Sequence, residues 1–290
     1  MPNAQILVNW LLIGSFYAAV ALGFSLVWGI MNIVNLAHGS LLILGAYVAY
    51  FAFTALHLNP FIGIILAMLA LFVVGWLIQY IAINRVIRAP LLVTFMLTFG
   101  LDLLITNLAQ QFFTANNRAI NSSLAGVNLT LGATVIPVQN VLAALIAVLL
   151  TAALSLFLAR TRTGNAILAV GMDRDAARLM GINIARTYAL TFALGAALAG
   201  AAGAMLAMTL QFQPVDAGQY TLFAFVIVAL GGLGTPWGAL AGGLLFGLAT
   251  TLSGSIQAIG PGLQTTVAFA VLVLVLVLRP RGVLGKAFYS

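Results

Sequence analysis

The sequence of 290 residues contains no cysteine, no glutamate, a single lysine and only four aspartates. Without cysteine, disulfide bonds and thiolate-bound metal sites are excluded. Charged residues make up 5% of the chain and hydrophobic residues 63%, whereas a soluble domain carries about 25% charged residues. A fold of this size cannot hide so much apolar surface from water. The composition therefore excludes an ordinary soluble protein.

Long apolar runs separate the few charges. Arg85 is the first charged residue, and residues 119–159, 187–215 and 217–278 contain none. A bilayer-spanning helix needs roughly 20 apolar residues, whereas a membrane β-barrel shows short alternating segments. The runs predict an all-α integral membrane protein, a polytopic bundle of about eight to nine transmembrane segments. The expected spans are 6–28, 38–56, 61–83, 91–112, 138–159, 188–210, 220–233, 237–254 and 262–278.

The basic residues predict how the chain is oriented. Arg85 and Arg88 follow the third expected span, and the segment 160–186 follows the fifth. Arg279, Arg281 and Lys286 follow the last span. Cytoplasmic loops are enriched in arginine and lysine, so we expect the N-terminus outside and the C-terminus in the cytoplasm, in a bacterial inner (plasma) membrane. The net charge of +7 is then explained by lipid contact and orientation and predicts no nucleic-acid partner.

Three further segments follow from this arrangement. The N-terminal apolar stretch lacks a basic leader and is too long for a signal peptide, so it is expected to be a retained span. The stretch FQPVDAGQY (212–220) falls in an external loop. Small residues repeat every four positions at Gly195, Ala199 and Gly203, a pattern that lets membrane helices pack closely. Gly238, Gly242 and Gly243 are interpreted in the same way.

Two stretches interrupt the apolar pattern. They are WGIMNIVNLAHGSLLILGAY (28–47) and ALGGLGTPWGALAGGLLFGL (229–248). Interrupted segments in corresponding parts of the two halves suggest an internal repeat and a substrate path. Irregular backbone at membrane depth survives only where protein buries it or where it lines a wet cavity. The alternative is two ordinary loops between spans, since loops also contain Asn, Gly and Pro.

One carboxylate and one histidine lie within or beside apolar segments. Asp102, in LLVTFMLTFGLDLLITNLAQQFF (91–113), costs about 2.5–3.5 kcal/mol at the bilayer centre and should face the bundle interior or a wet cavity. It could form structural hydrogen bonds, line the path with Asn107 and Gln110, or transfer protons, although no second acid lies in any expected span. His38 could be a pH-sensitive gate or a residue bonded to backbone carbonyls. The candidate path-lining residues are Asn32, Asn35, His38, Gly39, Asp102, Gly231, Gly232 and Gly234.

The loop 160–187 carries much of the charge. Seven of the fifteen charged side chains lie between Arg160 and Arg186. Asp173 is a good helix N-cap, Asp175 suits the first turn, and Gly181 suits a helix end. The spacing predicts a short helix with Ala176, Ala177, Leu179 and Met180 on one apolar face. So short a helix needs a packing partner. It could pack on this chain's own loops, lie at the lipid interface, or fill a groove in a cytoplasmic protein.

The sequence offers no catalytic machinery. No serine, histidine and acid arrangement suggests hydrolysis, and the two histidines, His38 and His57, are too far apart to predict a metal site. A P-loop ends in Lys-Ser or Lys-Thr, but the single lysine, Lys286, precedes Ala287. We therefore predict a protein that is not an enzyme and holds no cofactor. If ATP drives it, another chain must bind the nucleotide.

Three of these stretches carry a family resemblance. RTRTGNAILAVGMDRDAARLMGINIARTYALTFALGAALAGAAGAM, NIVNLAHGSLLILGAY and ALGGLGTPWGALAGGLLFG resemble the high-affinity branched-chain amino acid permeases of ABC importers, the LivH-like type. The likeness extends over about residues 10–282. It implies one permease domain over 1–290, a cytoplasmic coupling loop at 160–187, a second related permease chain, two ATPase chains and an external binding protein.

The resemblance also implies a role for the charged loop. The ATPase-coupling residues would be Asp173, Asp175, Ala176, Ala177, Arg178, Leu179, Met180 and Gly181. The implied cargo is a branched-chain or related amino acid, with urea or short amides as alternatives. A secondary transporter or channel for small polar solutes, acting alone, is the rival from another class. The shortage of ionisable groups for ion coupling argues against it.

Overall fold

The computed structural model describes residues 2–86, 89–121, 126–132, 134–255, 263–279 and 282–284. Three basic residues of the orientation argument, Arg88, Arg281 and Lys286, lie outside this part of the chain. The first half contains α1 (Pro2–Met31), α2 (His38–Thr54), α3 (Pro60–Ile78), the π-helical turn Gln79–Ile83, α4 (Asn84–Val86), α5 (Leu91–Phe113) and the strands β1 (Asn128–Leu131) and β2 (Thr134–Pro137). The second half contains α6 (Val138–Arg160), α7 (Arg162–Met172), α8 (Arg174–Leu179), α9 (Ile184–Thr209), the 3-10 turn Pro214–Asp216, α10 (Ala217–Gly231), α11 (Pro236–Ser255) and α12 (Gln264–Leu278).

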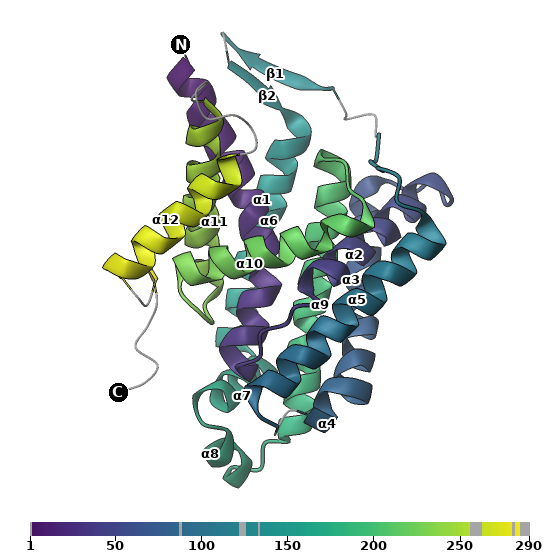
Figure 1. Ribbon diagram of the computed structural model, residues 1–290, viewed down its shortest axis with the longest axis vertical. Helices are drawn as coiled ribbons and strands as arrows, with labels where there is room; N and C mark the ends of the chain where they lie inside the picture. The colour runs from purple at the N-terminus through teal and green to yellow at the C-terminus, as the bar shows by residue number, and fades with distance from the viewer. Residues whose placement is uncertain are drawn as a thin grey trace.

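Long apolar helices make up most of the fold. Among the described residues, seven helices are long and apolar enough to cross a membrane, while α2 and α12 are shorter apolar helices. The β1–β2 hairpin lies at one end of the bundle, and α4, α7 and α8 lie at the other (Figure 1). The prediction of a multi-pass helical membrane protein is confirmed.

Helix α9 forms the centre of the bundle. Small residues occupy its surface, and α1, α2 and α3 pack on different sides of it. A Cβ atom at Gly195 would meet Val27 and the carbonyl of Gly23 in α1, and one at Gly203 would meet the backbone of Leu42 and Ala46 in α2. The small-residue repeat therefore brings helix backbones together, as its spacing predicts.

Helices α1 and α11 form an antiparallel pair that also depends on small residues. Gly247 packs against Gly14, Gly243 against Ala18, and Gly234 against Gly29. In these contacts the residue numbers fall towards the start of α11 as they rise along α1, so the two helices run in opposite directions. This fixes the connection between α10 and α11 near the end of α1.

The chain turns back on itself between α1 and α2. His38, the first residue of α2, is bonded through Nε2 to the carbonyl oxygen of Val20 at 2.7 Å. Val20 lies eleven residues before the end of α1 at Met31, which is about 16 Å along a helix axis. Residues 32–37 are not helical. They must run back beside α1, and α2 begins next to the middle of that helix.

Helix α10 runs across the bundle at mid-height in Figure 1. Its first residue, Ala217, packs against Gly39 in the first turn of α2. Phe212 lies further along α2, with its ring centroid 5.0 Å from that of Tyr47. The segment between them thus moves about 12 Å along α2, the rise of eight helical residues. The expected external loop 212–220 instead dips into the bundle.

Candidate functional site

The first interruption and α5 meet inside the bundle. Thr98 of α5 donates from Oγ1 to the carbonyl of Val34 in the interruption, at 3.1 Å. One turn further along α5, the carboxyl group of Asp102 lies beside Ser40 in the first turn of α2. Ser40 also donates to the carbonyl of Ala37 at 3.0 Å. Asp102 is half-buried, and its Oδ1 atom has no hydrogen-bond partner among the described residues.

Threonine 221 of α10 joins the interruption from the other side. Its Oγ1 accepts a hydrogen bond from the backbone N–H of Gly39 at 2.8 Å and lies 3.0 Å from the carbonyl oxygen of Leu36. The residue before α2, Ala37, has no side chain able to cap the helix. Thr221 supplies that cap from 182 residues away in sequence. Sequence reasoning missed it, because a threonine within an apolar helix gives no signal of its distant partner.

The structure separates the eight candidate path residues into two groups. Asn35, His38 and Gly39 are buried in the first interruption, beside α5 and Asp102. Asn35 is 3% exposed, and its Oδ1 has no partner in the described part of the chain. His38 is 1% exposed and bonded to a carbonyl, which favours the structural alternative over a pH-sensitive gate.

Asn32 belongs to the same interruption but lies at its open end. It is exposed, has a left-handed φ of 53°, and lines an open cleft of about 370 Å³. Thr94 of α5 and Met172 of α7 line the same cleft. The interruption therefore leads from an open cleft to the buried start of α2.

The glycine-rich stretch does not join this group. Gly231 and Gly232 are buried, and the carbonyls of Leu230 and Gly231 accept hydrogen bonds from Val283 and Leu284 at 2.9 and 3.0 Å. Gly234 packs near the end of α1. The two interruptions thus lie at different levels of α1: the first turns back to the middle of that helix, whereas Gly234 of the second packs near its end. Glycine and proline favour a turn whether it lies inside the membrane or at its surface. The sequence therefore does not indicate how deep a glycine-rich turn lies.

The charged loop contains the short helix that the sequence predicts. Asp173 is the N-cap of α8, and its Oδ1 accepts hydrogen bonds from the N–H groups of Asp175 and Ala176, each at 2.9 Å. Gly181 has a φ of 81°, and its N–H bonds to the carbonyl of Arg178. The N–H of Ile182 bonds to the carbonyl of Ala177. These two bonds form a Schellman motif.

The apolar face of α8 differs from the prediction. Ala177 is 5% exposed and packs inward, whereas Leu179 and Met180 are 89% and 83% exposed. Ala176 is exposed as well. The four residues do not share one face, because on a helix Ala177 lies about 160° from Leu179. Ala177 fixes the helix to the protein and leaves the two larger apolar side chains uncovered.

A longer helix in the loop was missed. Helix α7 spans Arg162–Met172, and its N-cap Thr161 accepts from the N–H of Gly164 at 2.9 Å. Gly164, Ile167 and Val170 are its buried residues. Their spacing of three residues was the available signal. The loop is therefore a folded α7–α8 unit.

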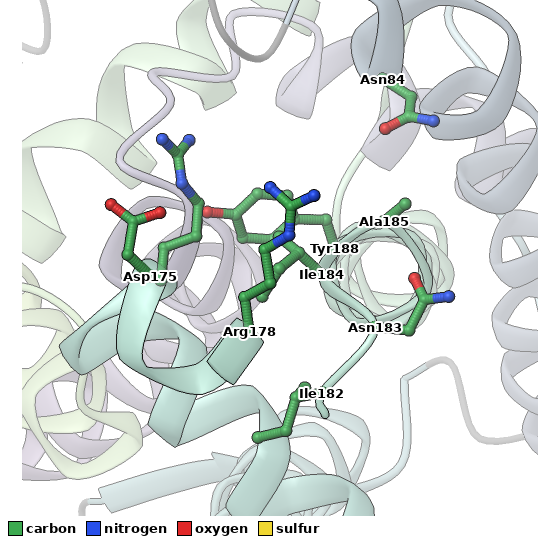
Figure 2. A pocket seen from close by; sticks show the side chains of 9 residues that line it. Asn84, Asp175, Arg178, Ile182, Asn183, Ile184, Ala185 and Tyr188 are labelled. Atoms are coloured by element: carbon green, nitrogen blue, oxygen red, sulfur yellow. The ribbon is translucent and has the colours of Figure 1, made fainter. Parts of the chain in front are cut away.

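An open cleft of about 680 Å³ separates α8 from the start of α9. Figure 2 shows Arg178 on the α8 side, Tyr188 and Asn183 on the α9 side, and Asn84 across the opening. Asn183 caps α9 by accepting from the N–H of Arg186 at 3.0 Å. The cleft is lined mainly by polar groups and lies at the same end of the bundle as α4 (Figure 1).

These features define a polytopic helical membrane protein with an interrupted helix in its interior and a folded polar loop at one end. Residues 6–278 match the family described as the permease component of branched-chain amino acid transport systems. The chain belongs to this family.

Individual relatives are similar over nearly their whole length. The chain is 34% identical to the high-affinity branched-chain amino acid transport system permease protein BraD of Pseudomonas aeruginosa, over 97% of this chain and 95% of the relative. It is 30% identical to LivH of Escherichia coli K12 over the same shares. It is 26% identical to the probable LivH of Methanocaldococcus jannaschii, over 98% of this chain and 93% of the relative. No solved structure gave a significant match.

Proposed function

We propose that this chain is the transmembrane subunit of an ATP-driven importer for branched-chain or related amino acids. The observation that carries the proposal is the match of residues 6–278 to a permease family. Relatives at 30–34% identity are named as high-affinity branched-chain amino acid permeases. An external binding protein would deliver the amino acid, a second related permease would complete the path, and two ATPase chains would bind ATP. No cofactor is assigned to this chain.

The α7–α8 loop is the proposed contact with the ATPase. Leu179 and Met180 project from a helix that is capped at both ends and anchored by Ala177. Exposed apolar side chains on a rigid support are suited to a groove in a partner protein. The eight coupling residues would transmit ATPase motion through α8 to α9, which follows it directly in the chain.

The proposed orientation places the α8 end of the bundle in the cytoplasm. Helix α4, which contains Arg85, lies at that end with α8, and the β1–β2 hairpin lies at the other (Figure 1). Counting α2 and α12 with the seven longer helices gives up to nine segments in one domain over 1–290. An internal repeat would relate the α1–α2 and α10–α11 connections. The N-terminus would then be outside and the C-terminus in the cytoplasm.

The first test is purification of the tagged chain from native membranes in mild detergent, with identification of every co-purifying chain. We expect an ATPase and a second permease. The complex is then reconstituted into liposomes. The binding protein is added, and ATP is supplied either inside or outside the liposomes. Leucine uptake that requires ATP supports the proposal. Recovery of the chain alone, with uptake that needs no ATP, would contradict it and favour a secondary transporter or channel.

A further inference from the structure

A polar ridge runs along the inward side of α5. Thr94, Thr98, Asp102 and Thr106 recur every four residues, so neighbouring members stand one turn apart, on a line that winds about 40° around the helix at each step. Most of the other residues of this helix are Leu, Phe and Met with large exposed fractions. Thr94 and Thr98 are buried and Asp102 and Thr106 are half-buried, so the ridge faces the protein. The other polar side chains of α5, Asn107, Gln110 and Gln111, lie towards its C-terminal end.

The ridge connects an open cleft to the buried interruption. Thr94 lines the 370 Å³ cleft together with Asn32. Thr98 bonds to the carbonyl of Val34, and Asp102 lies beside Ser40. The same polar line thus passes from water at one end of the bundle to the start of α2, which is half-way along α1.

Three polar atoms on or beside this ridge have no partner in the described part of the chain. They are Oδ1 of Asn35, Oδ1 of Asp102 and Oγ1 of Thr106, each buried from solvent. Buried polar atoms in folded proteins are almost always hydrogen-bonded, and an exception needs a cause. Asp102 and Thr106 stand one turn apart on α5, and Asn35 follows Val34, the residue whose carbonyl Thr98 bonds. Their unpartnered oxygens are acceptors left for a hydrogen-bond donor that binds for part of the time.

We infer that Asp102 is a contact for the ammonium group of the amino acid as it crosses the membrane. An ammonium group offers three donors and a positive charge, and the three orphan oxygens offer acceptors and one negative charge. An ionisable residue in a membrane helix commonly marks a substrate or ion path. The inference rests on the proposed function, because it takes the cargo to be an amino acid. It assigns a path role, rather than a purely structural one, to Asp102.

The first experiment tests the ridge without assuming any cargo. The chain has no native cysteine, so Thr106→Cys introduces a unique thiol one turn from Asp102. The variant complex is treated in membrane vesicles with a cationic methanethiosulfonate ethylammonium reagent and with the anionic ethylsulfonate reagent. We expect several-fold faster labelling by the cation, and loss of that preference when Asp102→Asn is added.

Two control positions make this result specific. Thr94→Cys, at the cleft end of the ridge, should label readily with water-soluble reagents. Leu104→Cys, on the exposed apolar side of α5, should show no charge preference that depends on Asp102. Absence of labelling at Thr106→Cys, or equal rates for both reagents, overturns the inference.

The second experiment measures transport by the complete complex. Asp102→Asn should lower leucine uptake at least tenfold while ATP hydrolysis stimulated by the binding protein is retained, and Asp102→Glu should recover part of the uptake. Wild-type uptake in Asp102→Asn overturns the inference and leaves the importer assignment intact. If the wild-type complex does not transport amino acids but cation-selective labelling persists, the proposed function fails and a cation-attracting path remains.

Discussion

The side chain of Thr221 caps the N-terminus of α2 by accepting a hydrogen bond from Gly39 N–H at 2.8 Å. The same oxygen lies 3.0 Å from the carbonyl of Leu36, so one hydroxyl serves a donor and an acceptor of the interruption. Buried backbone N–H and C=O groups need hydrogen-bond partners, and the Thr221 hydroxyl supplies one to each. Thr221 of α10 therefore helps to hold the irregular segment 32–37 in place, together with Thr98 of α5.

Replacing this hydroxyl should destabilise the bundle. Thr221→Val keeps the shape and removes the cap, at a cost of about 1–2 kcal/mol. Thr221→Ser should recover most of the loss. Thermal unfolding of the purified complex in detergent measures the effect. Thr250→Val is the matched control, because that hydroxyl bonds only within its own helix. Equal melting temperatures for Thr221→Val and the control would contradict the capping role.

The close approach of α1 and α11 leads to a second prediction. A Cβ atom at Gly243 would collide with the backbone of Ala18, so Gly243→Ala should destabilise the protein by about 1–3 kcal/mol. Gly100 lies in α5 with nothing within 4 Å of an added Cβ. Gly100→Ala should be neutral or stabilising by up to about 1 kcal/mol, because alanine favours helix. Melting temperatures of the two variants in detergent measure the effects. Equal melting temperatures would show that the contact between α1 and α11 accommodates an added methyl group.

The exposed tip of α8 can be tested by adding a charge. Leu179→Asp should uncouple ATP hydrolysis from leucine uptake, because the carboxylate would have to be desolvated in the ATPase groove. The chain should still fold, since Leu179 is 89% exposed. Leu129→Asp is a matched control, an exposed leucine in the hairpin at the opposite end. The rates of leucine uptake and of ATP hydrolysis in proteoliposomes measure the coupling. Normal uptake in Leu179→Asp would remove the coupling role.

The turn that ends α8 depends on glycine. Gly181 has a φ of 81°, and an alanine there would cost roughly 1–2 kcal/mol. Gly181→Ala should therefore loosen the end of α8 and speed trypsin cleavage after Arg178 in open membrane fragments. Gly181→Asn should resist cleavage better, because asparagine tolerates this conformation. Cleavage rates that do not change in either variant would show that the turn is held by other contacts.

Local features of the chain were predictable because neighbouring residues determine them. Asp173 caps α8 and Gly181 ends it through bonds within ten residues. The apolar runs indicate membrane helices because a bilayer requires them, and the small-residue repeat in α9 indicates close packing. The inward position of Ala177 was not predicted, since it depends on where the rest of the protein lies.

What the sequence by itself determined is the class of protein, the approximate helices and the caps of the charged loop, all of which follow from composition and short-range periodicity. Tertiary structure alone decided that residues 32–37 turn back along α1, that Thr221 caps α2, and that Asp102 faces Ser40. It also decided that the carbonyls of Leu230 and Gly231 bond to the chain at 283–284. These contacts join residues that are far apart in the chain. The packing of whole helices determines which of these residues meet, and no local sequence pattern indicates it.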